Sequence, residues 1–567
     1  MKHCPECNRN YADPTVSFCL QDGAPLIFGS AVEEPTTAIL SGDEPSDAPT
    51  RRIDPHTTEP TESYAFGEPQ IKSSGWRSNY IWILGVIAVV SVILAAVFGY
   101  RYFENADSKQ IDSVAVLPFE NGSGDPGLDY LSDGLSETLI DKLSQLPQLK
   151  VISRNSSFKY RGPNVDIKDA AAKLGVRALV TGKVSRVGDN LTVRIEMIDA
   201  SEDRQIWSEQ YEVKAANVLA VQREIAQEAL ENLRTKLTGE EKRRIARPDT
   251  TNPQAYDALL KARFYRNKGG RENRRKALDQ YLQAVSVDPT YALAYAELAD
   301  LYAILANQGE LDPKEATPKA EAAAQRAVEL DGDLAEAHTA LGYIRMNAWD
   351  WEAARSELLR ARELNPNDSR TRDLYAGYLG YMGRYDEAIA ESRRAVELSP
   401  LALGFQISLG DTLLESGRHD DALDTLNKVQ QLDPNRASVY VHLGYAYAAK
   451  NMHNEAVAAY NEAKRINNTE STSIECYLGA SLARLGDRSG AHKILEKLEV
   501  TKEYVSPGEL AILYTALGDR EKALSTLERA YKEHDLQLKY LNIETGYDDL
   551  RSEPRFQELV RKVGLPV

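Results

Sequence analysis

Three of the four cysteines lie near the start of the chain, in a pattern typical of metal binding. Cys4 and Cys7 form a C-x-x-C pair, and Cys19 and Asp22 form a C-x-x-D pair further along. Two such turns can place four ligands tetrahedrally around Zn²⁺. Because so few residues cannot bury a core, the metal would supply the folding energy of this segment. We therefore predict one structural zinc ion held by Cys4, Cys7, Cys19 and Asp22, with no catalytic role.

Residues 1–30 resemble the short N-terminal zinc ribbons of bacterial proteins. They depart from the four-cysteine pattern at the last ligand, where Asp22 replaces cysteine. Three interpretations stay open: Asp22 binds the metal through an oxygen atom, His3 binds in its place, or the site lacks its fourth ligand. A redox-active or free C-x-x-C pair is the competing hypothesis, and the third cysteine counts against it.

Other motifs of catalysis and cofactor binding are weak or missing in the sequence. Gly122, Gly124 and Gly127 form a G-x-G-x-x-G match between an expected strand and an expected helix, as in dinucleotide sites. Pro126 interrupts the match, and Arg154 stands where an acidic partner for the ribose is needed, so we do not expect nucleotide binding. The chain has no P-loop, no kinase H-R-D or D-F-G, no G-x-S-x-G and no H-E-x-x-H motif. We predict a protein that is not an enzyme and has no evident small-molecule substrate, with an unrecognised hydrolase as a remote alternative.

One long apolar stretch, residues 78–100, divides the chain. It carries no charged residue and lies between Arg77 and Arg101. A helix of this length spans roughly 35 Å, enough to cross a hydrocarbon core of about 30 Å. Aromatic side chains such as Trp82 and Tyr100 stand near its two ends, as membrane interfaces favour. We predict a single transmembrane helix, because a buried core helix rarely runs so long without a charge and a signal peptide would start at residue 1.

The segment in front of this helix, residues 31–75, is rich in Pro, Thr, Ser, Glu and Asp and is predicted to be a disordered linker. The charges that flank the helix do not decide its orientation. A three-cysteine zinc site needs reduced thiolates, which the cytosol maintains, and the rear part holds a single cysteine, Cys476. We therefore expect an inner-membrane protein with a cytoplasmic N-terminus and extracytoplasmic C-terminal domains.

The length of 567 residues is too great for one domain. The formal net charge of −17 argues against a nucleic-acid-binding protein, which needs a basic patch.

Residues 111–245 show the pattern of an α/β domain. Strands are expected at 111–119, 149–153, 178–187, 191–200 and 204–213. Helices are expected at 128–146, 167–174 and 215–237. The strings SVAVLPFENGSGDPGLDYLSDGLSETLIDKLSQLPQLKVISRNS, LGVRALVTGKV and LTVRIEMIDASEDRQIWSEQYE resemble the domain similar to the amino-terminal part of the TolB translocation protein. The resemblance implies a sensing or protein-binding role ahead of helical repeats, as in bacterial kinases, cyclases and transcriptional regulators, and it brings no catalytic residues.

Residues 250–567 repeat with a period of 34 residues, seen in the spacing of Pro366, Pro400 and Pro434. A small–large–small pattern precedes each proline, for example Ala388, Ser392 and Ala395 before Pro400. Small residues let two helices approach closely, and the proline turns the chain into the next pair. The segment resembles a tetratricopeptide repeat solenoid of about eight units, closed by a C-terminal capping helix.

Such stacks present a concave groove lined by the first helix of each repeat. Aromatic and acidic side chains there could hold a protein or peptide partner. The repeat period places in the groove Tyr343, Met346, Asn347, Asp373, Tyr381, Asp411 and Tyr445. Packing between repeats, or a solvated face, is the alternative for each. His338 and His442 fall at equivalent positions and are expected to pack rather than to bind metal.

The sequence thus predicts a multidomain chain: a zinc ribbon, a transmembrane helix, a TolB-like α/β domain and an all-α tetratricopeptide solenoid. The leading hypothesis is a membrane-anchored scaffold or sensor that binds protein partners through the repeats and the α/β domain. The alternative is a non-catalytic accessory or regulatory subunit of a signalling enzyme system of the cyclase or kinase type.

Overall fold

The computed structural model describes most of the chain from residue 111 onward. The described residues are 2–3, 10–11, 27–28, 111–162, 164–214, 217–233, 238–239, 241, 247–467 and 471–566. The chain divides into one compact unit of residues Met1–Ala88 and a second of Val89–Val567. The four predicted zinc ligands, the linker at 31–75 and the predicted membrane helix at 78–100 lie outside the described residues. Within the described residues, no helix is long and apolar enough to cross a membrane.

In the first unit, three short strands pair into an antiparallel sheet with β1 in the middle. Lys2 of β1 pairs with Tyr11 on one side and with Phe28 on the other. The strands are β1 (Lys2–His3), β2 (Asn10–Tyr11) and β3 (Ile27–Phe28).

The second unit begins with a mixed sheet in the order β6-β4-β7-β8-β9, with β5 paired beside β7. Its strands are β4 (Ser113–Val116), β5 (Glu120–Asn121), β6 (Lys150–Val151), β7 (Ala178–Val187), β8 (Asn190–Asp199) and β9 (Arg204–Lys214). β4 runs parallel to β6 and β7, whereas β7, β8 and β9 form an antiparallel meander. Along β8 every second side chain is buried, from Leu191 to Met197, as expected of a strand with one face on a core.

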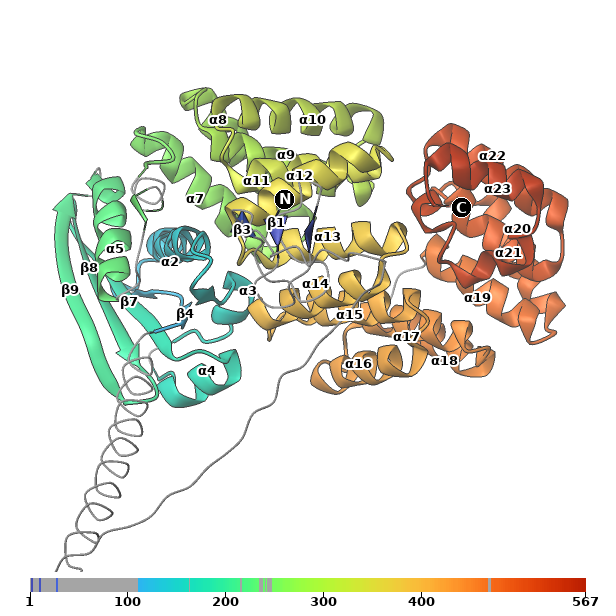
Figure 1. Ribbon diagram of the computed structural model, residues 1–567, viewed down its shortest axis with the longest axis horizontal. Helices are drawn as coiled ribbons and strands as arrows, with labels where there is room; N and C mark the ends of the chain where they lie inside the picture. The colour runs from blue at the N-terminus through green and yellow to red at the C-terminus, as the bar shows by residue number, and fades with distance from the viewer. Residues whose placement is uncertain are drawn as a thin grey trace, which may run out of the picture. The chain divides into compact units, whose positions relative to one another are not determined.

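Helices cover both faces of this sheet (Figure 1). They are η1 (Pro126–Leu128), α2 (Asp129–Ser144), α3 (Arg154–Ser157), α4 (Ile167–Leu174) and α5 (Val218–Asn232). α2 and α5 pack on the face that contains Val114 and Val116, and α4 packs on the opposite face with Ala115 and Leu117. Strands and helices thus lie where the sequence predicts them, apart from the small β5 and α3.

Helical repeats follow, and residues 253–533, as far as they are described, form eight helix pairs. The first helices are α7 (Pro253–Lys268), α9 (Ala292–Asn307), α11 (Ala335–Asn347), α13 (Ser369–Tyr381), α15 (Leu403–Glu415), α17 (Ala437–Ala449), α19 (Thr472–Arg484) and α21 (Pro507–Leu517). The second helices are α8 (Arg271–Val287), α10 (Pro313–Leu330), α12 (Trp351–Leu364), α14 (Tyr385–Leu398), α16 (His419–Leu432), α18 (His453–Asn467), α20 (Arg488–Val500) and α22 (Arg520–Glu533). We call the face formed by the first helices the inner face.

Close contact between the two helices of a pair explains the small residues of the repeat. Ala388 and Ala395 are fully buried, and Ser392 is 1% exposed. A Cβ atom on Gly410 would lie 2.8 Å from the side chain of Leu426 on the partner helix, too close for any residue but glycine without a shift. The repeat pattern read from the sequence therefore marks the helix–helix contacts.

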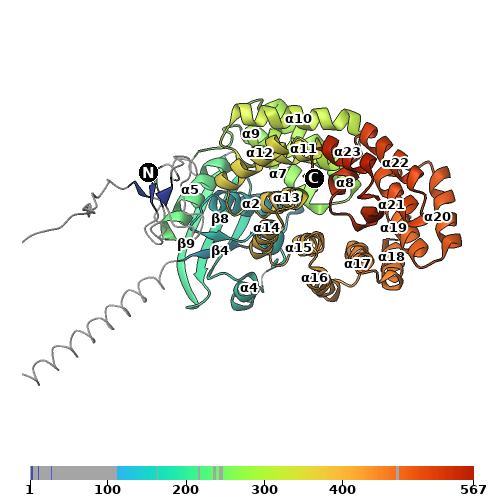
Figure 2. The ribbon, with the colours of Figure 1, turned by 45° about the vertical axis from the view of Figure 1, so that its right-hand side comes forward.

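The C-terminal segment does more than cap the last repeat. It comprises η3 (Leu536–Tyr540), η4 (Thr545–Leu550) and α23 (Pro554–Val563). Trp351 at the start of α12 donates a hydrogen bond from Nε1 to the carbonyl oxygen of Val563 over 2.7 Å. The ring of His534 stacks on that of Trp349 with centroids 3.9 Å apart. The end of the chain therefore returns to the third helix pair, as Figure 2 shows for α23 beside α11 and α12.

Candidate functional site

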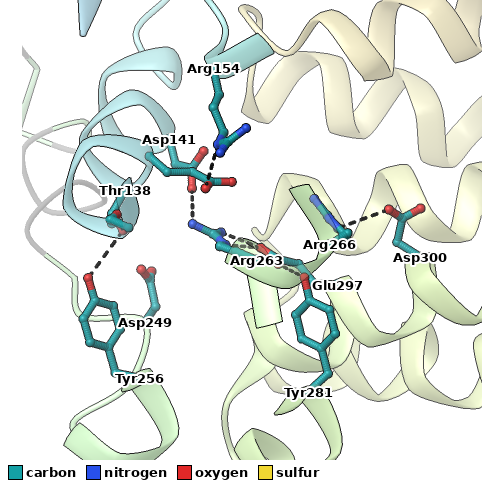
Figure 3. Close-up of polar contacts among 12 residues, drawn as sticks. Thr138, Asp141, Arg154, Asp249, Tyr256, Arg263, Arg266, Tyr281, Glu297 and Asp300 are labelled. Atoms are coloured by element: carbon teal, nitrogen blue, oxygen red, sulfur yellow. Dashed lines mark hydrogen bonds and ion pairs between the residues drawn. The ribbon is translucent and has the colours of Figure 1, made fainter. Parts of the chain in front are cut away.

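A network of ion pairs joins α2 of the α/β region to the first repeats (Figure 3). Arg263 of α7, 3% exposed, donates from Nη1 to Asp141 of α2 over 2.9 Å and from Nε to Glu297 of α9 over 2.8 Å. Tyr281 donates to the other oxygen of Glu297 over 2.7 Å. Burial opposes ionisation of Glu297, but Arg263 and Arg266 hold its pKa below the usual range. The carboxylate of Glu297 therefore stays ionised, with its charge balanced by the neighbouring arginines.

A second pairing extends this network along the inner face. Asp300 of α9 accepts hydrogen bonds from both terminal nitrogens of Arg370 on α13, and Arg266 lies 3.4 Å away. Burial opposes ionisation here too, yet Arg370 holds the pKa of Asp300 below its ordinary value. These pairs line a cavity of about 430 Å³ between α2 and the inner face, which we call the arginine cavity.

Asn367 provides a further joint between the α/β region and the repeats. Its side-chain nitrogen lies 2.8–3.0 Å from the carbonyl oxygens of Ser144, Leu146 and Leu149. These carbonyls stand at and after the end of α2, where the backbone has no helical partner. Asn367 is 4% exposed, so this amide takes the place that water would otherwise fill.

The structure corrects part of the predicted groove. Met346 is 3% exposed and Tyr381 is 7% exposed, and both belong to the hydrophobic core. Tyr381 donates a hydrogen bond to the hydroxyl of Tyr540 in η3 over 3.2 Å. The prediction that these two side chains line an open groove is wrong, because both are buried in the core and Tyr540 of the C-terminal segment packs on Tyr381.

Three further predicted groove residues are partly buried in the same region. The side-chain oxygen of Asn347 lies 3.4 Å from Nζ of Lys539 in η3. Tyr343 accepts a hydrogen bond from Asn307. Burial raises the pKa of Asp373 to about 7. All three therefore keep part of their surface accessible, and their role in a groove stays a prediction.

The remaining two, Asp411 and Tyr445, lie together in a second cavity of about 300 Å³. We call it the tyrosine pocket. It is lined by Asp411, Leu414, Glu415, His442, Tyr445, Ala448, Ala449, Tyr460, Tyr477, Glu509, Gln537, Tyr540, Ile543, Glu544 and Thr545. Most of these come from the inner face of α15 to α21, whereas Gln537 to Thr545 come from the C-terminal segment. Sequence reasoning missed Glu544 and Tyr540 because no repeat period places them there.

The polar groups of the tyrosine pocket are only partly paired. His442 Nδ1 lies 2.6 Å from Asp411, Tyr477 donates to Glu544 over 3.1 Å, and Ser473 donates to Glu509 over 2.6 Å. Glu415 makes no hydrogen bond or ion pair with the described part of the chain. The pocket therefore holds more carboxyl groups than cations.

A shallower hollow of about 470 Å³ adjoins this pocket at the N-terminal ends of α17 and α19. It is lined by Arg436, Ala437, Ser438, Val441, His442, Asn467, Ser471, Ser473 and Ile474. His442 lines both cavities, and Ser438 is exposed. We call this polar hollow the α17/α19 groove, and Ser438 makes this part of the inner face accessible.

The predicted packing histidines have acidic partners. His338 Nδ1 lies 2.5 Å from Glu357, and His442 contacts Asp411 as described. Cys476 is fully buried with a free thiol. Within the residues that the structure describes, no group of three His, Cys, Asp or Glu side chains is placed to hold a metal ion.

Comparisons with known proteins identify two parts of the chain. Residues 109–228 match the family profile of the second domain of HilA/YgeH-like transcriptional regulators. Tetratricopeptide repeat profiles match residues 378–437 and 413–472. The tetratricopeptide prediction is therefore confirmed for these repeats, whereas the TolB-like resemblance of the α/β region stays a prediction.

One curated relative shares a longer stretch. A protein of Rhizobium meliloti named "Putative adenylate cyclase 3" is 35% identical over 231 residues. The match spans 40% of this chain and 39% of that protein, so well under two thirds of the relative is represented.

Among solved structures, pilF of Pseudomonas aeruginosa is 20% identical, with 37% of this chain and 90% of that chain covered and a TM-score of 0.29. A tetratricopeptide repeat protein of Parabacteroides merdae is 14% identical, with 47% and 99% covered and a TM-score of 0.35. With TM-scores this low, the repeat assignment rests on the profile matches, and the chain carries tetratricopeptide repeats of the kind that suggests a protein-interaction scaffold.

Proposed function

We propose that this protein is a membrane-anchored scaffold that captures a protein partner in the α17/α19 groove. The observation that carries the proposal is the division of the inner face. Its first part is covered by α2 and joined to it through Arg263 and Asn367, and the middle of its remainder is open at Ser438. The α/β region and the repeats form one continuous support for that groove.

The anchor and the zinc ribbon belong to the same proposal. Residues 78–100 would hold the chain in the inner membrane, with residues 1–30 in the cytoplasm and the repeats outside it. A donor set of three thiolates and one carboxylate suits Zn²⁺, held by Cys4, Cys7, Cys19 and Asp22. A C-terminal reporter that fluoresces only in the cytosol should stay dark, and the purified chain should carry one zinc that Cys19→Ser removes more completely than Asp22→Ala.

Site-specific crosslinking tests the scaffold function. A photo-crosslinking amino acid at Ser438 should give one defined adduct with a partner after extraction in mild detergent. The matched control places the same amino acid at Asp424, which is exposed on the outer helix α16. Equal adducts from both positions, or none from Ser438, would contradict partner capture in the α17/α19 groove.

The second candidate function is a regulatory subunit of a cyclase-type enzyme system. The relative named as an adenylate cyclase, with 35% identity over 231 residues, favours it. An enzyme recovered with the chain in fixed stoichiometry, and crosslinked from Ser438, would identify this more specific role.

A further inference from the structure

The tyrosine pocket contains a polar group that the protein itself leaves unpaired. Tyr460 of α18 is 0% exposed, and its hydroxyl makes no hydrogen bond to any described residue. A buried hydroxyl without a partner costs free energy, so such groups usually meet a ligand or an ordered water. Tyr460 is also one of the residues that line the pocket.

Aromatic rings surround the same space. The ring of Tyr445 lies 4.5 Å from that of Tyr477 and 6.0 Å from that of Tyr460, measured between centroids. Tyr540 of η3 lines the pocket from the C-terminal side. The faces of tyrosine rings carry negative electrostatic potential and attract cations at short range.

The acidic side chains that line the tyrosine pocket would also attract a cation. Asp411, Glu415, Glu509 and Glu544 line the pocket, and His442 is the one lining side chain among those described that can carry a positive charge. Lys539 lies near Glu415 behind the rings of Tyr381 and Tyr540 and does not line the cavity.

Burial and the repulsion between neighbouring carboxyl groups raise the pKa values of Glu415 and Glu509. Burial, with Asp411 nearby, raises the pKa of Glu415 to about 8. Burial also raises the pKa of Glu509 to about 7, with Asp535 and Glu544 adding to the effect. A cation in the pocket would stabilise the ionised forms of both.

A metal ion fits this wall less well than an organic cation. No three acidic or histidine side chains among the described residues are close enough to share a metal ion. The carboxyls instead stand apart around a cavity of about 300 Å³ with aromatic walls. Such a space suits an alkyl chain that ends in an ammonium group, which packs its methylenes on the rings and donates to the carboxyls and to Tyr460.

We propose that the tyrosine pocket binds a primary ammonium group, carried by a free alkyl amine or by the lysine side chain of a peptide. Glu415 is its main counter-charge, and the Tyr460 hydroxyl accepts one of its hydrogen bonds. The proposal goes beyond the scaffold function and stands whether or not the α17/α19 groove captures a protein, because binding is measured on the purified chain alone.

Titration calorimetry on the full chain tests this, with 1,5-diaminopentane, the blocked peptide Gly-Lys-Gly and the uncharged 1,5-pentanediol as probes. We expect saturable binding of at least one amine and none of the diol. Saturation by the diamine alone assigns the pocket to a free amine, and saturation by the peptide alone assigns it to a lysine side chain. No saturable binding of either amine, or equal binding of the diol, would overturn the proposal.

Variants identify the pocket as the place of binding. Glu415→Gln should weaken binding about tenfold or more, since it removes a charged hydrogen-bond partner. Tyr460→Phe keeps the ring and removes only the hydroxyl, and should weaken binding about threefold. Glu455→Gln and Tyr504→Phe make the same changes at exposed positions and should leave binding unchanged. If all four variants bind the amine with equal affinity, the tyrosine pocket is not the binding site.

Proton release gives a readout that a loss of packing would not imitate. Because Glu415 and Glu509 are partly protonated near neutral pH in the free protein, ammonium binding at pH 7 should release protons. The heat of binding should therefore depend on the ionisation enthalpy of the buffer, and less so in Glu415→Gln. A heat that is the same in every buffer would count against carboxylate contact.

Discussion

The arginine cavity and the tyrosine pocket share the inner face of the repeats but neutralise their carboxyl groups differently. In the arginine cavity, Glu297 and Asp300 are held by Arg263 and Arg370. In the tyrosine pocket, Glu415 meets no arginine or lysine at hydrogen-bond distance in the described residues. Glu336 also lines the arginine cavity, and burial raises its pKa to about 8, so the contrast holds for Glu297 and Asp300 and not for every carboxyl group there. These two arginine-paired carboxylates belong to the joint between the α/β region and the repeats, whereas the residues that line the tyrosine pocket include no arginine or lysine.

Replacing Arg263 tests whether arginine pairing stabilises the arginine cavity, and it should give the largest effect. Arg263→Ala would leave Glu297 buried without the cation that donates hydrogen bonds to it, and we expect a loss of about 3–5 kcal/mol in the free energy of unfolding. Denaturant unfolding of the full chain measures it. Arg360→Ala removes an arginine from the more exposed pairs with Asp333 and Glu363 and should cost about 1 kcal/mol or less. Equal losses in the two variants would show that the arginine cavity is solvated.

Tyr381 tests the second difference, which is the covering of the inner face by the C-terminal segment. Tyr381→Ala removes a buried ring that packs on Trp351 and Tyr540, so we expect a loss of about 3 kcal/mol. Tyr381→Phe deletes only the hydroxyl and should cost about 1 kcal/mol. If Tyr381→Ala leaves the melting temperature unchanged, the C-terminal segment does not cover this face in solution.

Asn367 tests the joint independently of charge. Asn367→Ala leaves the carbonyl groups of Ser144, Leu146 and Leu149 without their shared donor, at a cost of about 1–3 kcal/mol. The matched control, Asn542→Ala, removes an amide that bonds one carbonyl near the exposed chain end. We also expect faster proteolysis between the α/β region and the repeats in Asn367→Ala, and unchanged proteolysis would mean that the ion pairs alone hold the joint.

The repeat pattern predicts the local packing of this fold well. Ala388, Ser392 and Ala395 follow from the 34-residue period, and all three are buried at helix contacts. Strand alternation and turn residues predict the main strands of the sheet equally well, because both signals are local.

The site depends instead on contacts between distant parts of the chain. His534 stacks on Trp349 and Val563 accepts from Trp351, and no period in the sequence relates these residues. The repeat period describes an open solenoid, so it predicts that Met346 and Tyr381 face a partner, whereas both are buried and Tyr381 packs on Tyr540 of the C-terminal segment. Asp411 and Tyr445, predicted to lie in a partner-binding groove, line the tyrosine pocket, and that groove role stays a prediction. The other wall of the pocket, with Tyr540 and Glu544, cannot be read from the repeats.

The smallest expected effect is a difference in pH response between the arginine-paired carboxyls Glu297 and Asp300 and the carboxyl of Glu415. Glu297 and Asp300 have pKa values below their ordinary range, so the stability they provide is present above the unfolded pKa and is lost in acid. Glu415 has the opposite sign: its pKa is raised to about 8, so its stability is fully present below the unfolded value of 4.5 and is lost as pH rises toward 8.

Glu415→Gln isolates the pH-dependent contribution of Glu415 to stability. A neutral amide replaces a carboxyl group that is neutral at pH 5 and charged at pH 9. The variant should match the parent chain at pH 5 and exceed its stability by about 1 kcal/mol at pH 9, a modest gain because the carboxyl still reaches solvent. Melting temperatures across this range measure the difference, and Glu455→Gln should show none. Saturation with 1,5-diaminopentane at pH 9 should reverse the order, since the parent chain gains stability from the bound ammonium and the variant gains little. A variant that is no more stable than the parent at pH 9 would mean that Glu415 is already neutralised, and the contrast between the two cavities would be lost.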